Sequence, residues 1–306
     1  MRRVASPLAT AGGLLLDRTF GEPPRELHPV VAFGTVMGAL ERRIWKDTRV
    51  RGAGYASVGV AIGASSGRML RSTSIAVAIA VAGSELRSVA ARIAEYLDAA
   101  DLSAARTALP NLVGRDPSQL DSSGVAAAVI ESLAENSVDA VFAPALWGAI
   151  AGPSGALAYR AINTMDSMVG HHSVRYERFG WASARLDDVA NLVPARVFAA
   201  TIAALEPARA RHIHRTIRRD ARLHPSPNAG VAEAAVAAAL DVELGGPLHY
   251  GDRLEMRPRL GAGRRPQADD IQRAIHLVDR AERLLLAALA LVGMLTHVRR
   301  SRRERP

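Results

Sequence analysis

The chain has 306 residues, which is enough for one large domain or two ordinary ones, and it contains no cysteine. The lack of cysteine excludes disulfides, thiolate zinc sites and a cysteine nucleophile. Apolar residues make up 49% of the chain but aromatic residues only 4%, so Ala, Val, Leu and Ile supply most of the hydrophobicity. Such a mixture favours helices that pack closely, as they do in membranes.

The formal net charge is +9, and the basic residues occur in blocks at 42–51, 209–222 and 299–305. These blocks flank apolar runs and are not interleaved with aromatic residues that could stack on bases. The pattern therefore speaks against a nucleic-acid partner. It indicates solvated loops beside a membrane, on its cytoplasmic side by the positive-inside rule.

The first half of the chain reads as helices with one proline-rich break. Apolar runs cover 4–16, 53–67 and 72–83, whereas 21–29 is too rich in proline to be helical. Residues 84–105 have the spacing of an amphipathic helix. Residues 110–123 predict a loop, with Ser122 or Ser123 as the cap of the next helix.

The second half adds apolar runs at 138–159, 189–205 and 284–298, of which the first is comfortably long enough to span a membrane. Residues 231–240 predict a short Ala-rich helix, and 269–295 a long one. Gly and Pro punctuate 224–263, whose end suggests a short hairpin or an irregular loop. We predict an all-α, polytopic membrane helical bundle with sizeable polar loops. It forms one membrane-embedded domain over 1–306, with a polar loop excursion at 207–268.

Three acids form the sharpest chemical feature of the sequence. Glu131, Glu135 and Asp139 are spaced four apart, so an α-helix would place them on one face. Carboxylate oxygens suit Mg²⁺, which often bridges phosphates. The alternative is an exposed helix face that precedes a membrane segment.

A second set of polar residues follows the long apolar run. Arg160, Asn163 and Asp166 are three apart and share a helix face, which could hold a ligand or could satisfy neighbouring helices. The loop after them carries arginines that suit phosphate or carboxylate.

Other signals are weaker when taken alone. Asp187 and Asp188 form an acidic pair that is also common at helix N-termini, and His28 and Arg115 lie in turns or loops. The sequence contains no GxxxxGK[ST], GxGxxG, HExxH or GxSxG motif, so any ATP site is of an unfamiliar kind.

Five blocks together resemble the adenosylcobinamide-phosphate synthase family of cobalamin (vitamin B12) biosynthesis, the CobD/CbiB type. They occur in the order of the family and span most of the chain. The blocks are DRTFGEPPRELHPV at 17–30, GRDPSQLD at 114–121, ESLAENSVDAVFAPALW at 131–147, YRAINTMDSMVGHHSVRYERFGWASARLDDVANLVPAR at 159–196 and SPNAGVAEAAVAAALDVELGGPLHYGD at 226–252.

The resemblance implies a multi-pass protein of the cell membrane with its polar catalytic loops in the cytoplasm. It implies a carbon–nitrogen ligase that joins adenosylcobyric acid, a corrinoid, to aminopropanol or its O-phosphate, giving adenosylcobinamide or its phosphate. ATP would be the co-substrate and Mg²⁺ the metal. Membrane lipid and other late enzymes of the pathway are the expected partners.

Under this hypothesis the acids take catalytic roles, and the arginines and amides bind substrate. The catalytic candidates are Glu131, Glu135, Asp139, Asp187 and Asp188, with Mg²⁺ at the first three. The candidates for binding substrate or phosphate are His28, Arg115, Asn136, Arg160, Asn163, Asp166, Arg175, Arg178, Arg185 and Asn228.

Two alternatives of other classes stay open from the sequence. One is a membrane transporter or non-catalytic corrinoid-binding protein, since broken apolar helices with polar groups at mid-depth would suit transport. The other is a soluble all-α binding protein.

Overall fold

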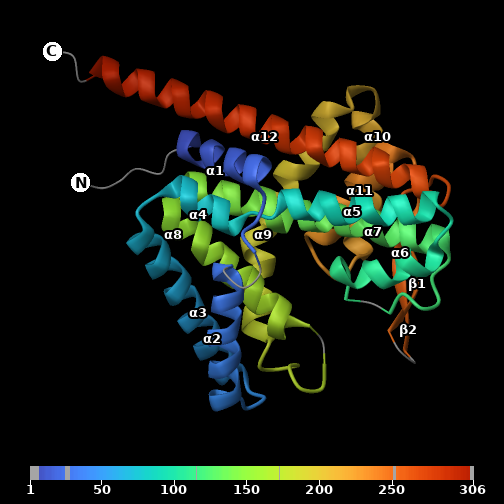
Figure 1. The fold of residues 1–306 in the computed structure, drawn as a ribbon, viewed down its shortest axis with the longest axis horizontal. Helices are drawn as coiled ribbons and strands as arrows, with labels where there is room; N and C mark the ends of the chain where they lie inside the picture. Colours follow the sequence, from blue (N-terminus) through green and yellow to red (C-terminus); the bar gives the residue numbers. More distant parts are fainter. Residues whose placement is uncertain (1–6, 25–27, 115, 172, 251–252, 304–306) are drawn as a thin grey trace. The chain divides into compact units, whose positions relative to one another are not determined.

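The computed structural model describes residues 7–24, 28–114, 116–171, 173–250 and 253–303. Helices dominate these residues, and two antiparallel strands form a single hairpin (Figure 1). The predicted all-α bundle is confirmed. Four helical stretches are long and apolar enough to cross a membrane: Thr73–Asp98, Ser122–Gly170, Trp181–Leu205 and Ala268–Arg299.

The chain divides into two compact units, each built from segments distant in sequence. Unit 1 comprises residues 1–82, 139–191 and 285–306, and unit 2 comprises residues 83–138 and 192–284. This division does not test whether both units belong to one membrane-embedded domain, which stays a prediction.

Unit 1 is organised around two long helices that run side by side. Its elements are α1 (Pro7–Phe20), α2 (Pro29–Ile44), α3 (Arg49–Leu70), α4 (Thr73–Ala80), the π-helical turn η3 (Val138–Phe142, from residue 139), α8 (Ala143–Met165) and the π-helical turn η4 (Asp166–Gly170). The start of α9 (Trp181–Leu205) and the end of α12 (Ala268–Arg303) complete it.

Glycines let α3 approach α8 closely. A Cβ on Gly63 would lie 2.6 Å from the Leu157 carbonyl oxygen, and one on Gly67 would lie 2.2 Å from that of Pro153. Small residues at such four-residue steps are a common means of helix association in membranes, because they expose the backbone to the partner. The glycines that make the 53–67 segment weakly hydrophobic therefore serve its packing.

A kink divides α8. Gly152 has a φ of 66° and a ψ of −153°, which lie outside the helical region, and Pro153 follows it. Proline removes a backbone donor, and glycine tolerates the positive φ at low cost. The longest predicted apolar run is thus bent within its length.

Unit 2 surrounds a buried Ala-rich helix, α11 (Ala229–Leu240), every residue of which is buried. The other elements are α5 (Gly83–Asp98), α6 (Leu102–Ala108), η2 (Leu109–Asn111), α7 (Ser122–Ser137), η5 (Pro207–Arg209), α10 (Ala210–Asp220), η6 (Ala221–Leu223), β1 (Leu244–Tyr250) and β2 (Arg253–Leu260). The end of α9 and the start of α12 also belong to it.

Several sequence predictions need correction in detail. The helix predicted over 84–105 ends at Asp98, and Ala100 takes a φ of 57° before α6 begins. The cap of α7 is Asp121, whose carboxylate accepts from the Gly124 N–H, and not Ser122 or Ser123. The 207–268 segment is more regular than a polar loop, since it contains α10, α11 and the predicted hairpin.

Because the α3–α8 contact has no room for a side chain, Gly63→Leu should destabilise the protein by about 3 kcal/mol, the upper end for overpacking. Gly54→Leu is the matched control, since a Cβ on Gly54 of the same helix meets nothing within 4 Å. Thermal unfolding in detergent measures both. Equal midpoints for the two variants would contradict the packing described.

Candidate functional site

The side-chain amide of Asn163 joins two carboxylates inside unit 1. Its Nδ2 donates to Asp139 Oδ2 at 3.2 Å and to Asp187 Oδ1 at 3.4 Å. Asn163 lies on α8, Asp139 on η3 and Asp187 on α9, so three chain segments converge on one amide. Both acids are partly buried.

The network continues into the core of the unit. Asn191 Nδ2 donates to Asp187 Oδ2 at 2.9 Å, and the Tyr159 hydroxyl donates to Asn191 Oδ1 at 2.9 Å. Tyr159 and Asn191 are each only 1% exposed. Because the four-residue spacings 159/163 and 187/191 each place two partners on one helix face, two helices are enough to fix the geometry.

Two π-helical turns flank α8, and each begins with or contains a candidate acid. Asp139 lies in η3 and Asp166 is the first residue of η4. A π turn widens the helix, so the prediction that Asp139 follows Glu131 and Glu135 at α-helical spacing is wrong. Such turns occur frequently at functional sites.

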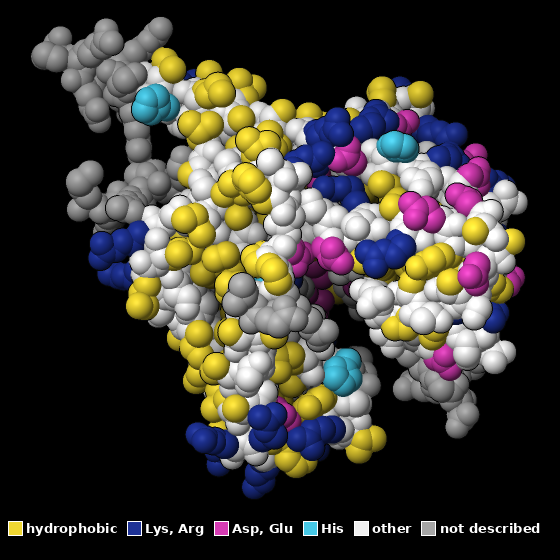
Figure 2. All heavy atoms as spheres, viewed as in Figure 1, with side chains coloured by type: hydrophobic (Ala, Val, Ile, Leu, Met, Phe, Trp, Pro, Cys, Tyr) yellow, Lys and Arg dark blue, Asp and Glu magenta, His cyan; other side chains and the backbone are white. Residues whose placement is uncertain are grey.

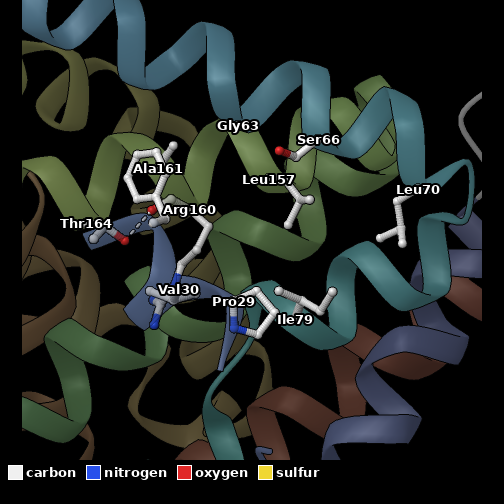
Figure 3. A pocket seen from close by; sticks show the side chains of 11 residues that line it. Pro29, Val30, Gly63, Ser66, Leu70, Ile79, Leu157, Arg160, Ala161 and Thr164 are labelled. Carbon is white, nitrogen blue, oxygen red and sulfur yellow. Dashed lines mark hydrogen bonds between the residues drawn. The ribbon is translucent and has the colours of Figure 1, made fainter. Parts of the chain in front are cut away.

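Arg160 extends from α8 toward the start of α2 and lines a cavity of about 210 Å³ (Figure 3). Its NH1 donates to Asn163 Oδ1 at 3.4 Å, its Nε has no hydrogen-bond partner, and it makes no ion pair with any described residue. The other residues that line the cavity are mostly apolar: Pro29, Val30, Phe33, Gly63, Ser66, Leu70, Ile79, Leu157, Ala161 and Thr164.

His28 caps the helix that borders this cavity. The Val30 N–H donates to His28 Nδ1 at 3.2 Å, while His28 Nε2 lies 3.3 Å from Glu22 Oε2. Burial, followed by the nearby Arg160 guanidinium, lowers the pKa of His28. The ring is therefore neutral near pH 7, with its proton on Nε2.

The donor set beside Asn163 suits a hard cation. Asp139 and Asp187 present carboxylate oxygens, and Mg²⁺ is commonly held by one or two carboxylates together with substrate phosphates and water. No three His, Asp or Glu side chains among the described residues form a ready metal group. These two acids would hold Mg²⁺ with the substrate supplying further oxygens.

Comparisons with known proteins identify the family of this chain. The family model described as CobD/Cbib protein matches residues 10–278. The chain belongs to this family.

Individual relatives agree with that assignment. The "Cobalamin biosynthesis protein CobD" of Mycobacterium tuberculosis (strain CDC 1551 / Oshkosh) is 45% identical over 94% of this chain and 95% of its own length. The protein of that name from Sinorhizobium fredii is 40% identical over 91% and 94%, and that from Rhodobacter capsulatus is 50% identical over 68% and 66%. No solved structure matches the chain.

Four predicted site residues of this family member belong to unit 2. Glu131 is buried, and its Oε1 accepts from the Gly245 N–H at 2.7 Å, which steadies a β1 residue of positive φ. Asn136 donates to Ser132 Oγ at 2.8 Å, and Glu135 is exposed. Asn228 precedes α11, and its Oδ1 accepts from Arg196 NH1 at 2.7 Å.

The predicted arginines of the 171–185 region are exposed and bind nearby protein groups. Arg175 NH2 pairs with Glu41 Oε1 at 2.7 Å, and Arg185 NH1 pairs with Asp188 Oδ2 at 3.0 Å. The backbone N–H of Arg178 donates to Asp47. Arg115 lies outside the described residues.

Sequence reasoning missed two groups of residues. In unit 1 it gave no role to Tyr159 or Glu22. In unit 2 it missed a cluster on and beside α11, where His224 Nε2 accepts from Arg257 NH1 at 3.1 Å and lies 3.8 Å from Glu233 Oε1. A single Glu within an otherwise apolar Ala-rich run was the available signal for the second group.

The lowered pKa of His28 predicts a dependence of stability on pH. Below the unfolded value of 6.5 the unfolded chain takes up a proton that the folded chain resists, so stability falls as the pH drops from 7 toward 5. The slope is at most about 1.4 kcal/mol per pH unit.

His28→Asn keeps an N-cap acceptor without the titration, so it should flatten this dependence in denaturant unfolding. His212→Asn, at an exposed position of α10, is the control and should leave it unchanged. A variant His28→Asn with the wild-type pH profile would refute the assignment.

Proposed function

We propose that the protein is a cobinamide(-phosphate) synthase, a ligase that forms a carbon–nitrogen bond in cobalamin biosynthesis. It amidates adenosylcobyric acid with aminopropanol or its O-phosphate and uses ATP and Mg²⁺. One observation in particular supports a ligase: a pair of carboxylates on one amide, next to a cavity with an arginine that makes no ion pair among the described residues.

The chemistry needs an activated carboxylate, because a carboxylate and an amine do not condense at neutral pH. The carboxylate oxygen of the corrinoid attacks the γ-phosphorus of ATP, which releases ADP and leaves an acyl phosphate. The amine nitrogen then attacks the acyl carbon, the C–O bond to phosphate breaks, and inorganic phosphate leaves. The amine loses a proton to a base.

We assign two roles to Asp139 and Asp187: they accept this proton, and they would hold the metal. A carboxylate that amide donors orient can take a proton from the ammonium group of the substrate, which frees the lone pair of the amine for attack. Mg²⁺, when bound, would supply positive charge against the phosphates of ATP. Asn163 and Asn191 are positioning residues for the two acids.

Arg160 is the residue we assign to the phosphate of the amine substrate. Its guanidinium lines the cavity and also bonds Asn163, which bonds both acids. A three-carbon amino-alcohol phosphate bound there would lie with its phosphate on Arg160 and its amine toward Asp139 and Asp187. Ser66 and Thr164 supply the other polar lining.

The remaining predicted site residues keep their proposed roles in the same reaction. We retain Glu131, Glu135 and Asp188 as acids, Asp166, Asn136, Asn228 and His28 as groups that orient substrate, and Arg115, Arg175, Arg178 and Arg185 as anion ligands. In the cell the protein would be a multi-pass membrane protein. Its polar catalytic loops would lie in the cytoplasm, where other late enzymes of the pathway can associate.

Asp187→Asn preserves shape and one acceptor oxygen, so it should retain the fold while lowering turnover by about 100-fold or more, the range for a lost acid–base group. The assay supplies detergent-purified protein with adenosylcobyric acid, ATP, Mg²⁺ and each amine. Asp98→Asn, at an exposed position of α5, is the control. Normal turnover by Asp187→Asn would remove this acid from the mechanism, and no amide from folded wild type with either amine would favour a transporter or binding protein.

Arg160→Gln should raise KM for aminopropanol O-phosphate by at least about tenfold while changing KM for free aminopropanol little, since a phosphate contact of this kind contributes roughly 1.5–3 kcal/mol. Arg92→Gln, at an exposed position of α5, controls for loss of charge. If both amines lost affinity equally, Arg160 would not be the phosphate ligand.

A further inference from the structure

One end of unit 1 lies where two of the candidate membrane spans meet. The stretch Ser122–Gly170 ends there and Trp181–Leu205 begins there, with residues 171–180 between them. Helices that cross hydrocarbon must end at its boundary with water. This end of the unit therefore lies at a membrane surface.

The connection between α2 and α3 joins the same end. Trp45 Nε1 donates to the Arg175 carbonyl oxygen at 3.2 Å, and Asp47 Oδ1 accepts from the N–H groups of Arg178 and Phe179, each at 2.8 Å. A Cβ on Gly52 would lie 1.9 Å from the Phe179 carbonyl oxygen, so the two connections are in direct contact. We call residues 41–51 with 173–181 the α2–α3 end.

Positive charge gathers on the α2–α3 end. Figure 2 shows a group of Lys and Arg side chains there, at the bottom of the view. The exposed basic residues of the connection and its flanks are Arg42, Arg43, Lys46, Arg49 and Arg51. Three carboxylates belong to this end: Glu41 pairs with Arg175, Asp47 holds two backbone N–H groups, and Glu177 is exposed.

Two of these cations lie at positions that are unfavourable for the stability of α3. Arg49 and Arg51 occupy the first turn of α3, which contains no acidic residue. The N-terminal end of a helix carries partial positive charge, so cations there are unfavourable unless an anion lies nearby. Asp47, which precedes the N-cap residue Thr48, offsets part of this cost, and external negative charge would offset more of it.

Exposed aromatic rings accompany the charge. Trp45 is 39% exposed and Trp181 is 42% exposed. The Arg175 guanidinium lies 4.5 Å from the Trp45 ring centroid, and that of Arg49 lies 4.9 Å from the Trp181 centroid. Tryptophan is enriched at the level of lipid headgroups, where its ring is half in hydrocarbon and half in water.

We propose that the α2–α3 end binds anionic phospholipid headgroups and faces the cytoplasm. Clustered Lys and Arg beside a span recognise negative lipids, and the positive-inside rule places such clusters on the cytoplasmic side. Arg42, Arg43, Lys46, Arg49 and Arg51 are not among the residues proposed for the ligase reaction.

Lipid titration of the full chain in detergent, followed by tryptophan fluorescence, tests the headgroup. Phosphatidylglycerol should bind at least about 100-fold more tightly than phosphatidylcholine. The variant Lys46→Gln/Arg49→Gln/Arg51→Gln should lose about 100-fold in affinity for phosphatidylglycerol, at about 1 kcal/mol per basic residue.

The control removes three charges elsewhere: Arg211→Gln/Arg215→Gln/Arg218→Gln, at exposed positions of α10. It should keep the lipid preference. Equal loss in both triple variants, or equal binding of the two lipids by wild type, would overturn the proposal. If the first variant aggregates, Arg42→Gln/Arg43→Gln carries the same test with an expected loss of about 30-fold.

Orientation is measured independently with Lys46→Cys, because the chain has no cysteine of its own. A membrane-impermeant maleimide should label this variant in inverted vesicles and not in intact cells, with the cysteine-free wild type as the blank. Labelling in intact cells would place the α2–α3 end outside and overturn the proposal.

Discussion

The arrangement of unit 1 depends on holding two carboxylates in a largely apolar helical environment. Charged groups there are costly unless polar partners surround them. The amide of Asn163 contacts both Asp139 and Asp187, and Asn191 adds a second donor to Asp187. These amide donors are neutral, so they orient the two carboxylates without themselves cancelling the negative charge. Carboxylates oriented in this way suit a metal, an ammonium group or a proton as ligand.

The close packing of helices makes this arrangement possible. Gly63 and Gly67 bring α3 against α8, and the kink at Gly152 bends α8 within its length. The π turns before and after α8 shift the angular positions of Asp139 and Asp166 on the helix. Arg160 contacts Asn163 and also lines the cavity. Its guanidinium, which can bind an anion, is thereby linked through Asn163 to the two carboxylates.

The sequence predicted the helical bundle and the Ala-rich helix from the spacing of apolar residues, and Gly and Pro marked the region of the hairpin. Three-residue spacing also grouped Arg160 with Asn163, whose side chains contact each other. It could not predict that Glu131 would bond Gly245, 114 residues away, or that Glu41 would hold Arg175. The segment VDAVF at 138–142 likewise carries no local pattern that predicts its π turn. Such features depend on which segments meet, and no local pattern encodes that.

The central claim is that the carboxylate of the corrinoid is activated by phosphoryl transfer at the Asn163 network. The most direct measurement uses adenosylcobyric acid labelled with ¹⁸O in the reacting carboxylate, with ATP, Mg²⁺ and aminopropanol O-phosphate. Wild-type protein should transfer one label to inorganic phosphate for each amide formed, and Asp187→Asn should form neither product at a comparable rate. Amide formation with unlabelled phosphate, or full activity of Asp187→Asn, would contradict this account.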